Sequence, residues 1–343
     1  MKEVKAFVKT VLDFYKDNKR SMPWRDDTRP YSIVVSEIML QQTQVHRVIP
    51  KYTEWMKLFP DWESLVHADT KQVLTAWMGL GYNRRALYLK KIAEEVTSNE
   101  KYSFLNPDMK TTLSHRKRNL LDADSAERFS ASKARILCSL DSTRVRGKKR
   151  SFEGVPDAIN LLQLLPGIGP NTAGAILTYA FNISVPFIET NIRSVFIHHF
   201  FLEIDQPSLK LRHGKKKKEK CPVSDKQIFP YIEKVLQDER VSTNPREWYW
   251  ALMDYGSHLK KQLPNPSRRS THHAKQSTFE GSHRKLRADI LKCIIKKSIT
   301  LAAIEKQFHT DVYQVKQIRE AVKELASEGF IQKNTHTNTY SVN

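Results

Sequence analysis

The segment LLPGIGPNTAGAI at residues 164–176 decides how the rest of the chain is interpreted. An apolar run with helical spacing stops at Pro166, and a second helical run begins at Pro170. Glycine permits a tight turn and a close approach of the backbone to a ligand, and both Gly167 and Gly169 lie between the two runs. The segment therefore predicts a helix-hairpin-helix.

Such a hairpin is suited to binding DNA without reading its sequence. The unpaired amides at the N-terminus of the second helix can donate to a phosphate, where the helix dipole also favours negative charge. We therefore expect DNA contacts from the hairpin residues Gly167, Ile168, Gly169 and Thr172. A Gly-x-Gly alone is also typical of an ordinary turn. The longer pattern LPGxGxxTAxxI, with a carboxylate downstream at Glu189, is more specific.

The composition indicates a polyanionic partner. The 343 residues include 57 Lys and Arg against 37 Asp and Glu, a formal net charge of +20. This excess of positive charge favours nucleic acid as the partner. The sequence has no run of about 18 apolar residues, which a membrane span would need. The first 20 residues mix both charges with apolar side chains, so we expect no signal peptide. The expected protein is a monomer in the cytoplasm, associated with the nucleoid if the source is prokaryotic, without membrane contact.

The cysteines and histidines predict no metal site and no cofactor. Cys138, Cys221 and Cys293 are far apart, and three thiolates cannot complete a four-cysteine site. The histidines between residues 257 and 284 have no thiolate or carboxylate partner at ligand spacing.

Helical periodicity predicts a mostly α protein. Residues 1–104 and 153–262 form one expected helical domain, with helices over 4–17, from Pro30 to about Gln44, and over 71–77, 84–96, 226–237 and 246–258. Residues 21–25 are expected to form a loop. The basic, serine-rich segment 105–152 lacks this periodicity, which predicts a disordered insertion. Residues 263–283 are expected to be a linker.

Residues 284–343 are expected to form a separate module. Helical patterns at 284–297, 300–308 and 311–327 precede a polar two-stranded hairpin, an order that resembles a winged helix. Its third helix would expose Gln314, Lys316, Gln317 and Arg319 toward a DNA groove. Winged helices also dock proteins, and both interpretations stay open.

Glu37 is the first candidate catalytic residue. It follows Ile33 and Val34 at helical spacings of four and three, which places it on or beside an apolar stripe. A partly desolvated carboxylate has a raised pKa, as a general acid near neutral pH requires. The alternative is a carboxylate at the edge of the stripe that points to water.

Four segments together resemble one enzyme family. Pro23-Trp24-Arg25, SEIMLQQTQV at 36–45, GLGY at 79–82 and the hairpin are similar to the MutY-type adenine DNA glycosylases, which remove adenine mispaired with oxidised guanine. The resemblance covers residues 20–100 and 153–260. It implies a helix-hairpin-helix glycosylase fold of two helical subdomains and a partner of double-stranded DNA with a mispaired or damaged base.

The resemblance also implies roles for individual residues. Glu37 would protonate the adenine ring, Glu189 would stabilise the sugar cation, and Asn191 would help to hold the sugar. Gln42 would insert into the base stack and Tyr82 would wedge beside the damaged guanine. Further DNA contacts are expected from Leu40, Arg25 and Arg193.

The chemistry of the reaction agrees with these roles. Cleavage of an N-glycosidic bond builds positive charge on the sugar as the base leaves, so one acid and one carboxylate are needed. The target base must first leave the stack, which calls for a side-chain wedge and a grip on the flanking phosphates.

The sequence departs from the family pattern at several points. Glu189 stands where the family uses aspartate, so its carboxylate can be displaced by about 1 Å. Asn171 stands where bifunctional relatives place a Schiff-base lysine, and it is the fourth candidate catalytic residue. Cysteines for the iron-sulfur cluster of many relatives are absent, and the family's usual C-terminal domain for oxidised guanine is not evident.

Three functional hypotheses follow. The leading one is a monofunctional adenine-specific mismatch glycosylase acting opposite 8-oxoguanine or guanine in base excision repair. The second is a thymine or uracil mismatch glycosylase on the same scaffold, against which the QQTQ run at 41–44 argues. The third is a DNA-binding protein without catalysis. It is disfavoured by Glu37 and left open by Glu189.

Overall fold

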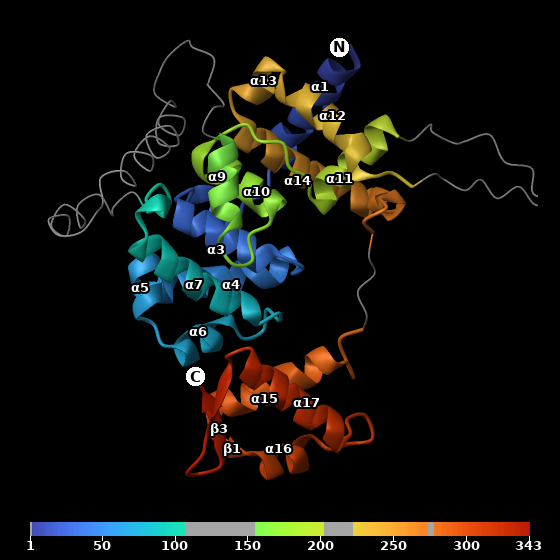
Figure 1. Cartoon of the computed structure of the whole chain (residues 1–343). Helices are drawn as coiled ribbons and strands as arrows, with labels where there is room; N and C mark the ends of the chain where they lie inside the picture. Colours follow the sequence, from blue (N-terminus) through green and yellow to red (C-terminus); the bar gives the residue numbers. More distant parts are fainter. Residues whose placement is uncertain (1, 107–154, 202–221, 274–277) are drawn as a thin grey trace, which may run out of the picture. The chain divides into compact units, whose positions relative to one another are not determined.

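A computed structural model describes residues 2–106, 155–201, 222–273 and 278–343 (Figure 1). These residues are mostly helical, as the periodicity predicts. The predicted insertion at 105–152 lies almost entirely outside them, and residues 215–220, which are five lysines and one glutamate, lie entirely outside them. The chain divides into two compact units, and residues 164–167 of the hairpin belong to a different unit from residue 168 onward.

The first unit is helical, and its core lies where α14 contacts α1 and α11. Phe7 on α1 makes edge-to-face contacts with Phe196 on α11 and Trp248 on α14. The expected loop at 21–25 is wrong, because Pro23 starts a short helix at the position where proline is best tolerated. The elements are α1 (Lys2–Asn18), α2 (Pro23–Asp26), α9 (Val155–Gln163), α10 (Pro170–Phe181), α11 (Thr190–Phe200), α12 (Asp225–Leu236), α13 (Glu239–Ser242), α14 (Pro245–Gln262) and η5 (Pro266–Arg269).

The second unit begins with six helices around an aromatic core. The Trp55 indole donates to the Tyr31 hydroxyl at 3.2 Å, and Tyr31 donates to the carbonyl of Phe59. Each polar atom thus has a partner, so burial of the rings costs little. The helices are α3 (Pro30–Leu40), α4 (Val45–Leu58), α5 (Trp62–His67), α6 (Thr70–Trp77), α7 (Arg84–Ser98) and η1 (Glu100–Tyr102).

The C-terminal part of the second unit has three helices and a three-stranded antiparallel sheet in the order β1-β3-β2. The expected order of helices and hairpin is observed, with β1 as an addition. The third helix starts at Val315 rather than at 311, because the Thr310 hydroxyl accepts from the amides of Val312 and Tyr313 and holds a turn there. The elements are α15 (His283–Lys296), β1 (Ile299–Thr300), α16 (Leu301–Phe308), α17 (Val315–Ser327), β2 (Ile331–Asn334) and β3 (Thr339–Val342).

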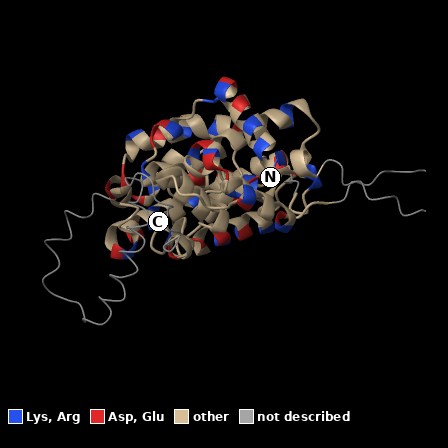
Figure 2. Ribbon diagram, turned by 90° about the horizontal axis from the view of Figure 1, so that it is seen from above, with Lys and Arg blue, Asp and Glu red and all other residues tan. Residues whose placement is uncertain are grey.

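Lys and Arg positions alternate with Asp and Glu positions along the helices (Figure 2). Several form ion pairs, such as Arg319 with Glu305 on the exposed side of α17. Gln314, Lys316, Gln317 and Arg319 are all exposed, as expected. Within the described ranges, no helix combines the length and the apolar character that crossing a bilayer requires.

Candidate active site

The turn that follows α3 carries Gln42. We expected this helix to continue to about Gln44, but it ends at Leu40, and Gln42 has a left-handed backbone with φ 54°. The guanidinium of Arg85 explains the early end. It donates to the carbonyl oxygens of Ile38, Met39 and Gln41 at 2.8, 2.9 and 2.6 Å. These groups would otherwise lack partners at a helix C-terminus.

Arg85 also holds the turn that carries Tyr82. It donates to the Gly81 carbonyl at 2.9 Å and to the Thr43 hydroxyl at 3.0 Å. Tyr82 has φ 49° and is 39% exposed. A left-handed backbone is uncommon outside glycine and often marks a functional site. One buried cation therefore fixes both turns that are expected to enter DNA.

Our sequence interpretation missed Arg85. Burial lowers its pKa to about 10, so the side chain stays charged near neutral pH. A signal was present, because Arg85 shares the spacing of four and seven with the buried residues Leu89 and Ile92 of α7. An arginine on an apolar stripe requires several hydrogen-bond acceptors in the core.

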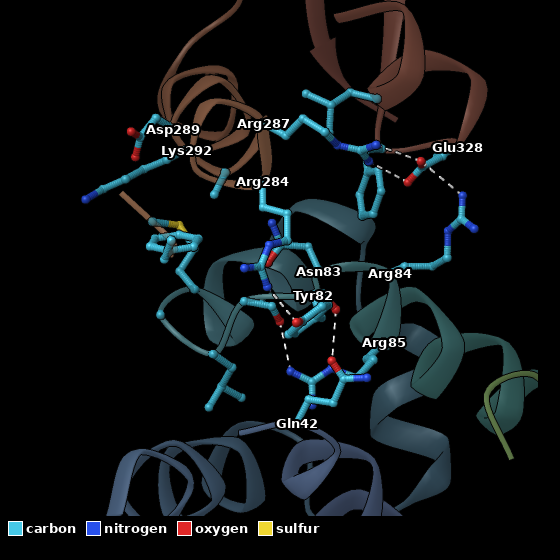
Figure 3. Close-up of a pocket in the computed structure, with 18 of the residues that line it drawn as sticks. Gln42, Tyr82, Asn83, Arg84, Arg85, Arg284, Arg287, Asp289, Lys292 and Glu328 are labelled. Atoms are coloured by element: carbon cyan, nitrogen blue, oxygen red, sulfur yellow. Dashed lines mark hydrogen bonds and ion pairs between the residues drawn. The ribbon is translucent and has the colours of Figure 1, made fainter. Parts of the chain in front are cut away.

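A cavity of about 780 Å³ lies beside these turns, within the second unit (Figure 3). Arg284 on α15 donates to the Tyr82 hydroxyl at 2.6 Å, and its guanidinium lies 5.6 Å from the centre of the Tyr82 ring. The Glu328 carboxylate forms ion pairs with Arg84 at 3.1 Å and with Arg287 at 2.6 Å. The C-terminal part of the unit thus contacts the aromatic ring expected to wedge into DNA.

The hairpin is observed where the sequence predicts it, between the end of α9 at Gln163 and the start of α10 at Pro170. Gly167 has φ 79°, and a Cβ there would lie 2.6 Å from the Tyr88 ring, so only glycine fits. Its carbonyl accepts from the Gln41 side chain at 2.9 Å.

The remaining hairpin residues expected to contact DNA differ in exposure. The Ile168 side chain is buried and Thr172 is half-buried. Gly169 is the N-cap of α10, and a Cβ added there would meet no atom within 4 Å. Ile168 can therefore offer a ligand only its backbone. This arrangement suits phosphate binding by amides at the start of α10.

Glu189 lies at the N-terminus of α11, in the first unit. The Asn171 side chain on α10 accepts a hydrogen bond from the Ile188 amide at 3.2 Å and so braces the backbone just before Glu189. Desolvation raises the pKa of Glu189 to about 7, although Arg193 and Lys260 oppose the shift. A carboxylate with this pKa changes its charge near neutral pH.

Asn191, two residues later, contacts α14. Its side-chain oxygen accepts from the Lys260 ammonium at 2.7 Å. The start of α11 in the first unit thus carries Glu189 and Asn191. Asn171 contacts it from α10, and Lys260 contacts it from α14. Lys260 was missed in the sequence, where its spacing from the hairpin gives no signal.

Arg25 and Arg193 both have structural partners. Arg25 lies 2.8 Å from Asp254, with side chains only 6% and 1% exposed, and Arg193 pairs with Asp225 through two bonds of 2.7 Å. The predicted DNA contacts of Arg25 and Arg193 stay predictions, and in this structure both guanidinium groups are held by carboxylates of the first unit.

Glu37 and Leu40 are on α3 of the second unit, and both are half-buried. The residues on either side of Glu37, Ser36 and Ile38, are fully buried. Glu37 therefore lies beside the apolar stripe, the position that its spacing from Ile33 and Val34 predicts. That position is compatible with a partly desolvated acid.

The cysteines do not fit a four-thiolate iron-sulfur cluster, the cofactor that the resemblance brings into question. The sequence has three cysteines, of which Cys293 lies on α15 and two lie outside the described residues. Across the part of the chain that the structure describes, no group of three or more His, Cys, Asp and Glu side chains could hold a metal ion.

The family of the chain follows from the hairpin and from a match along the sequence. The model of the HhH-GPD superfamily of base excision DNA repair proteins matches residues 35–236, more than half of the chain. The chain belongs to this superfamily. The helix-hairpin-helix glycosylase fold implied by the resemblance is thereby confirmed.

Several adenine DNA glycosylases are similar to this HhH-GPD protein. The Buchnera aphidicola (Baizongia pistaciae) enzyme is 30% identical over 58% of this chain and 43% of its own length. The Mus musculus enzyme is 30% identical over 62% of this chain and 33% of its own length. The Homo sapiens enzyme is 31% identical over 56% of this chain and 28% of its own length. Each match thus spans less than half of the relative. A thermostable thymine-DNA glycosylase structure gives a TM-score of 0.46 at 18% identity over 75% of this chain and 87% of that one.

Proposed function

We propose that this protein is a DNA glycosylase that hydrolyses the N-glycosidic bond of adenine mispaired with 8-oxoguanine or guanine. Its partner is double-stranded DNA, and it acts as a monomer without cleaving the strand. The observation that carries the proposal is the carboxylate of Glu189 at the start of α11, just after the backbone that Asn171 of the hairpin helix α10 holds through the Ile188 amide. Similarity to adenine DNA glycosylases supports the choice of base.

The two carboxylates divide the chemistry. Glu37 donates a proton to the departing adenine, which makes the base a better leaving group. Ionised Glu189 stabilises the positive charge that develops on the sugar, and water completes the hydrolysis. Glu189 is partly desolvated, so its charge acts in a medium of low effective dielectric constant.

The turns at Gln42 and Tyr82 serve base extrusion. Unstacking a base costs a few kcal/mol. A wedge that is already rigid loses little conformational entropy on binding, so more of its contact energy is left to offset that cost. Arg85 provides that rigidity through its bonds to both turns. The amides at the start of α10 grip a phosphate without sequence preference.

Asn171 supports the monofunctional assignment. Its amide nitrogen cannot form a Schiff base with the sugar, and its oxygen is bonded to the Ile188 amide. Water must then complete the reaction, which leaves an abasic strand intact.

A single-turnover assay tests the proposal with four duplexes that place A opposite 8-oxoguanine, A opposite G, T opposite G, and U opposite G. We expect base release from the first two only, with strand breaks that appear after alkali. Release of T or U instead of A would assign the protein to the pyrimidine mismatch class. Binding of all four duplexes without release would identify a non-catalytic protein. Breaks without alkali would contradict the monofunctional assignment.

A further inference from the structure

Lys260 lies directly against the proposed catalytic turn. It is on α14, and its ammonium donates to the side-chain oxygen of Asn191 on α11 at 2.7 Å. The close approach of the two helices fixes this contact. Gly256, one helical turn before Lys260, would place a Cβ only 2.4 Å from the Asn191 carbonyl oxygen. The backbone of α14 therefore touches the turn and holds the Lys260 side chain beside Asn191.

Two cations, Arg193 and Lys260, act on the charge of Glu189, and they differ in the other groups that they contact. Arg193 lies on α11 and forms two bonds to Asp225 of α12, whose carboxylate is also 3.8 Å from His272. Asp225 therefore offsets much of the positive charge of Arg193. Lys260 contributes a second positive charge that acts on Glu189. Arg193 has the larger influence on Glu189, but Lys260 is the cation that also bonds the catalytic turn directly, through Asn191.

Burial of Lys260 has a measurable consequence. Desolvation, followed by repulsion from Arg193, lowers its pKa to about 8, while Glu189 acts in the opposite direction. The amine is thus mostly charged at pH 7. A surface lysine on the same helix, Lys261, is exposed and offers a matched control.

We propose that Lys260 is a positioning residue for base excision, because its ammonium fixes the Asn191 side chain and places a positive charge beside the turn that begins at Glu189. This role rests on the proposed glycosylase function. It differs from that of a Schiff-base lysine, because the amine acts as a charged hydrogen-bond donor and forms no covalent bond.

The first test compares single-turnover rates from pH 5.5 to 8.5 for wild type, Lys260→Met, Lys260→Arg and Lys261→Met on A opposite 8-oxoguanine. Lys260→Met removes the charge that favours ionised Glu189, so the rise of rate with pH moves about one unit higher. At pH 7 the rate falls about tenfold to a hundredfold. Lys260→Arg keeps the profile near its wild-type position, and Lys261→Met changes neither quantity.

Two outcomes of this test would overturn the proposal. One is a slower Lys260→Met variant whose pH profile has not moved, which would indicate a purely structural role. The other is a borohydride-trapped adduct at Lys260 in the wild type that forms as fast as the base is released, which would make the amine a nucleophile.

A second measurement needs no DNA and no activity. In protein labelled with ¹³C at lysine Cε, the Lys260 signal is assigned by its loss in Lys260→Arg and is followed by NMR during a pH titration. We expect a midpoint near 8 that falls further in Glu189→Gln, because the attractive carboxylate is gone. A midpoint at the ordinary lysine value of about 10.4, unchanged by Glu189→Gln, would refute the coupling. If the coupling is present but wild type releases no base, the proposed function fails and the coupling stands.

Discussion

The Cα of Gly256 faces the backbone carbonyl of Asn191 so closely that a Cβ at position 256 would lie 2.4 Å from the carbonyl oxygen. This contact joins α14 to the first turn of α11, the turn that begins at Glu189. Backbone cannot rotate away as a flexible side chain can. The separation of these two helices, and with it the position of the proposed catalytic carboxylate, depends on a residue without a side chain.

Gly256→Ala should therefore impair both stability and base release. Overpacking of this kind typically costs about 1–3 kcal/mol, which lowers Tm by roughly 2–4 °C for each kcal/mol in a protein of this size. The displaced turn should also slow excision by about a hundredfold. Thermal unfolding and single-turnover rates provide the measurement. Gly169→Ala is the stability control, because its Cβ meets nothing within 4 Å. A fully stable and active Gly256→Ala variant would contradict the packing argument.

Glu37→Gln should abolish base release and leave duplex affinity within a few-fold of wild type. The change removes the acidic proton while keeping the size of the side chain, and general acid catalysis usually contributes about a hundredfold or more. Single-turnover excision and a gel-shift titration measure the two effects. Glu63→Gln on α5, an exposed position, is the control. Excision above about a tenth of the wild-type rate would be incompatible with this role.

Arg85→Met should loosen both turns that carry the proposed wedge residues. The loss of bonds to the carbonyls of Ile38 and Met39 leaves buried acceptors unsatisfied, at a cost of about 1–3 kcal/mol each. Urea unfolding should show lower stability, and excision should fall more than the affinity for a matched duplex. Arg85→Lys should be intermediate, since lysine keeps the charge but offers fewer donors. Lys91→Met, at an exposed site of α7, serves as the control. Unchanged unfolding in Arg85→Met would refute this network.

On the acidic side of its profile the wild-type rate should rise with pH through a midpoint near 7, and loss of the Glu37 proton should lower the rate again at higher pH. The pKa of Glu189 is raised to about 7, so below this pH the carboxyl is mostly neutral and cannot stabilise the sugar cation, and above it the carboxylate is ionised. Glu189→Gln should lose this rise and most of the activity. Single-turnover rates between pH 5.5 and 8 on one duplex would measure it. A midpoint that persists in Glu189→Gln would assign the titration to another group.

The sequence alone determined the local features. Proline and glycine at 166–170 placed the hairpin, because these residues restrict or release backbone angles whatever their surroundings. Helical spacing identified α3 and put Glu37 beside its apolar stripe for the same reason. The error at the end of α3 had a tertiary cause, since Arg85 lies 44 residues beyond Gln41.

Only the tertiary structure decided which side chains meet around the two proposed sites. Lys260 is 69 residues from the Asn191 side chain that it contacts, and Arg25 is 229 residues from its partner Asp254. Periodicity gives the face that a helix buries, but the packing of that face against other helices depends on the shapes of many side chains at once. Desolvation then sets the charge of Glu189 and Lys260, and burial arises only when the packed helices exclude water.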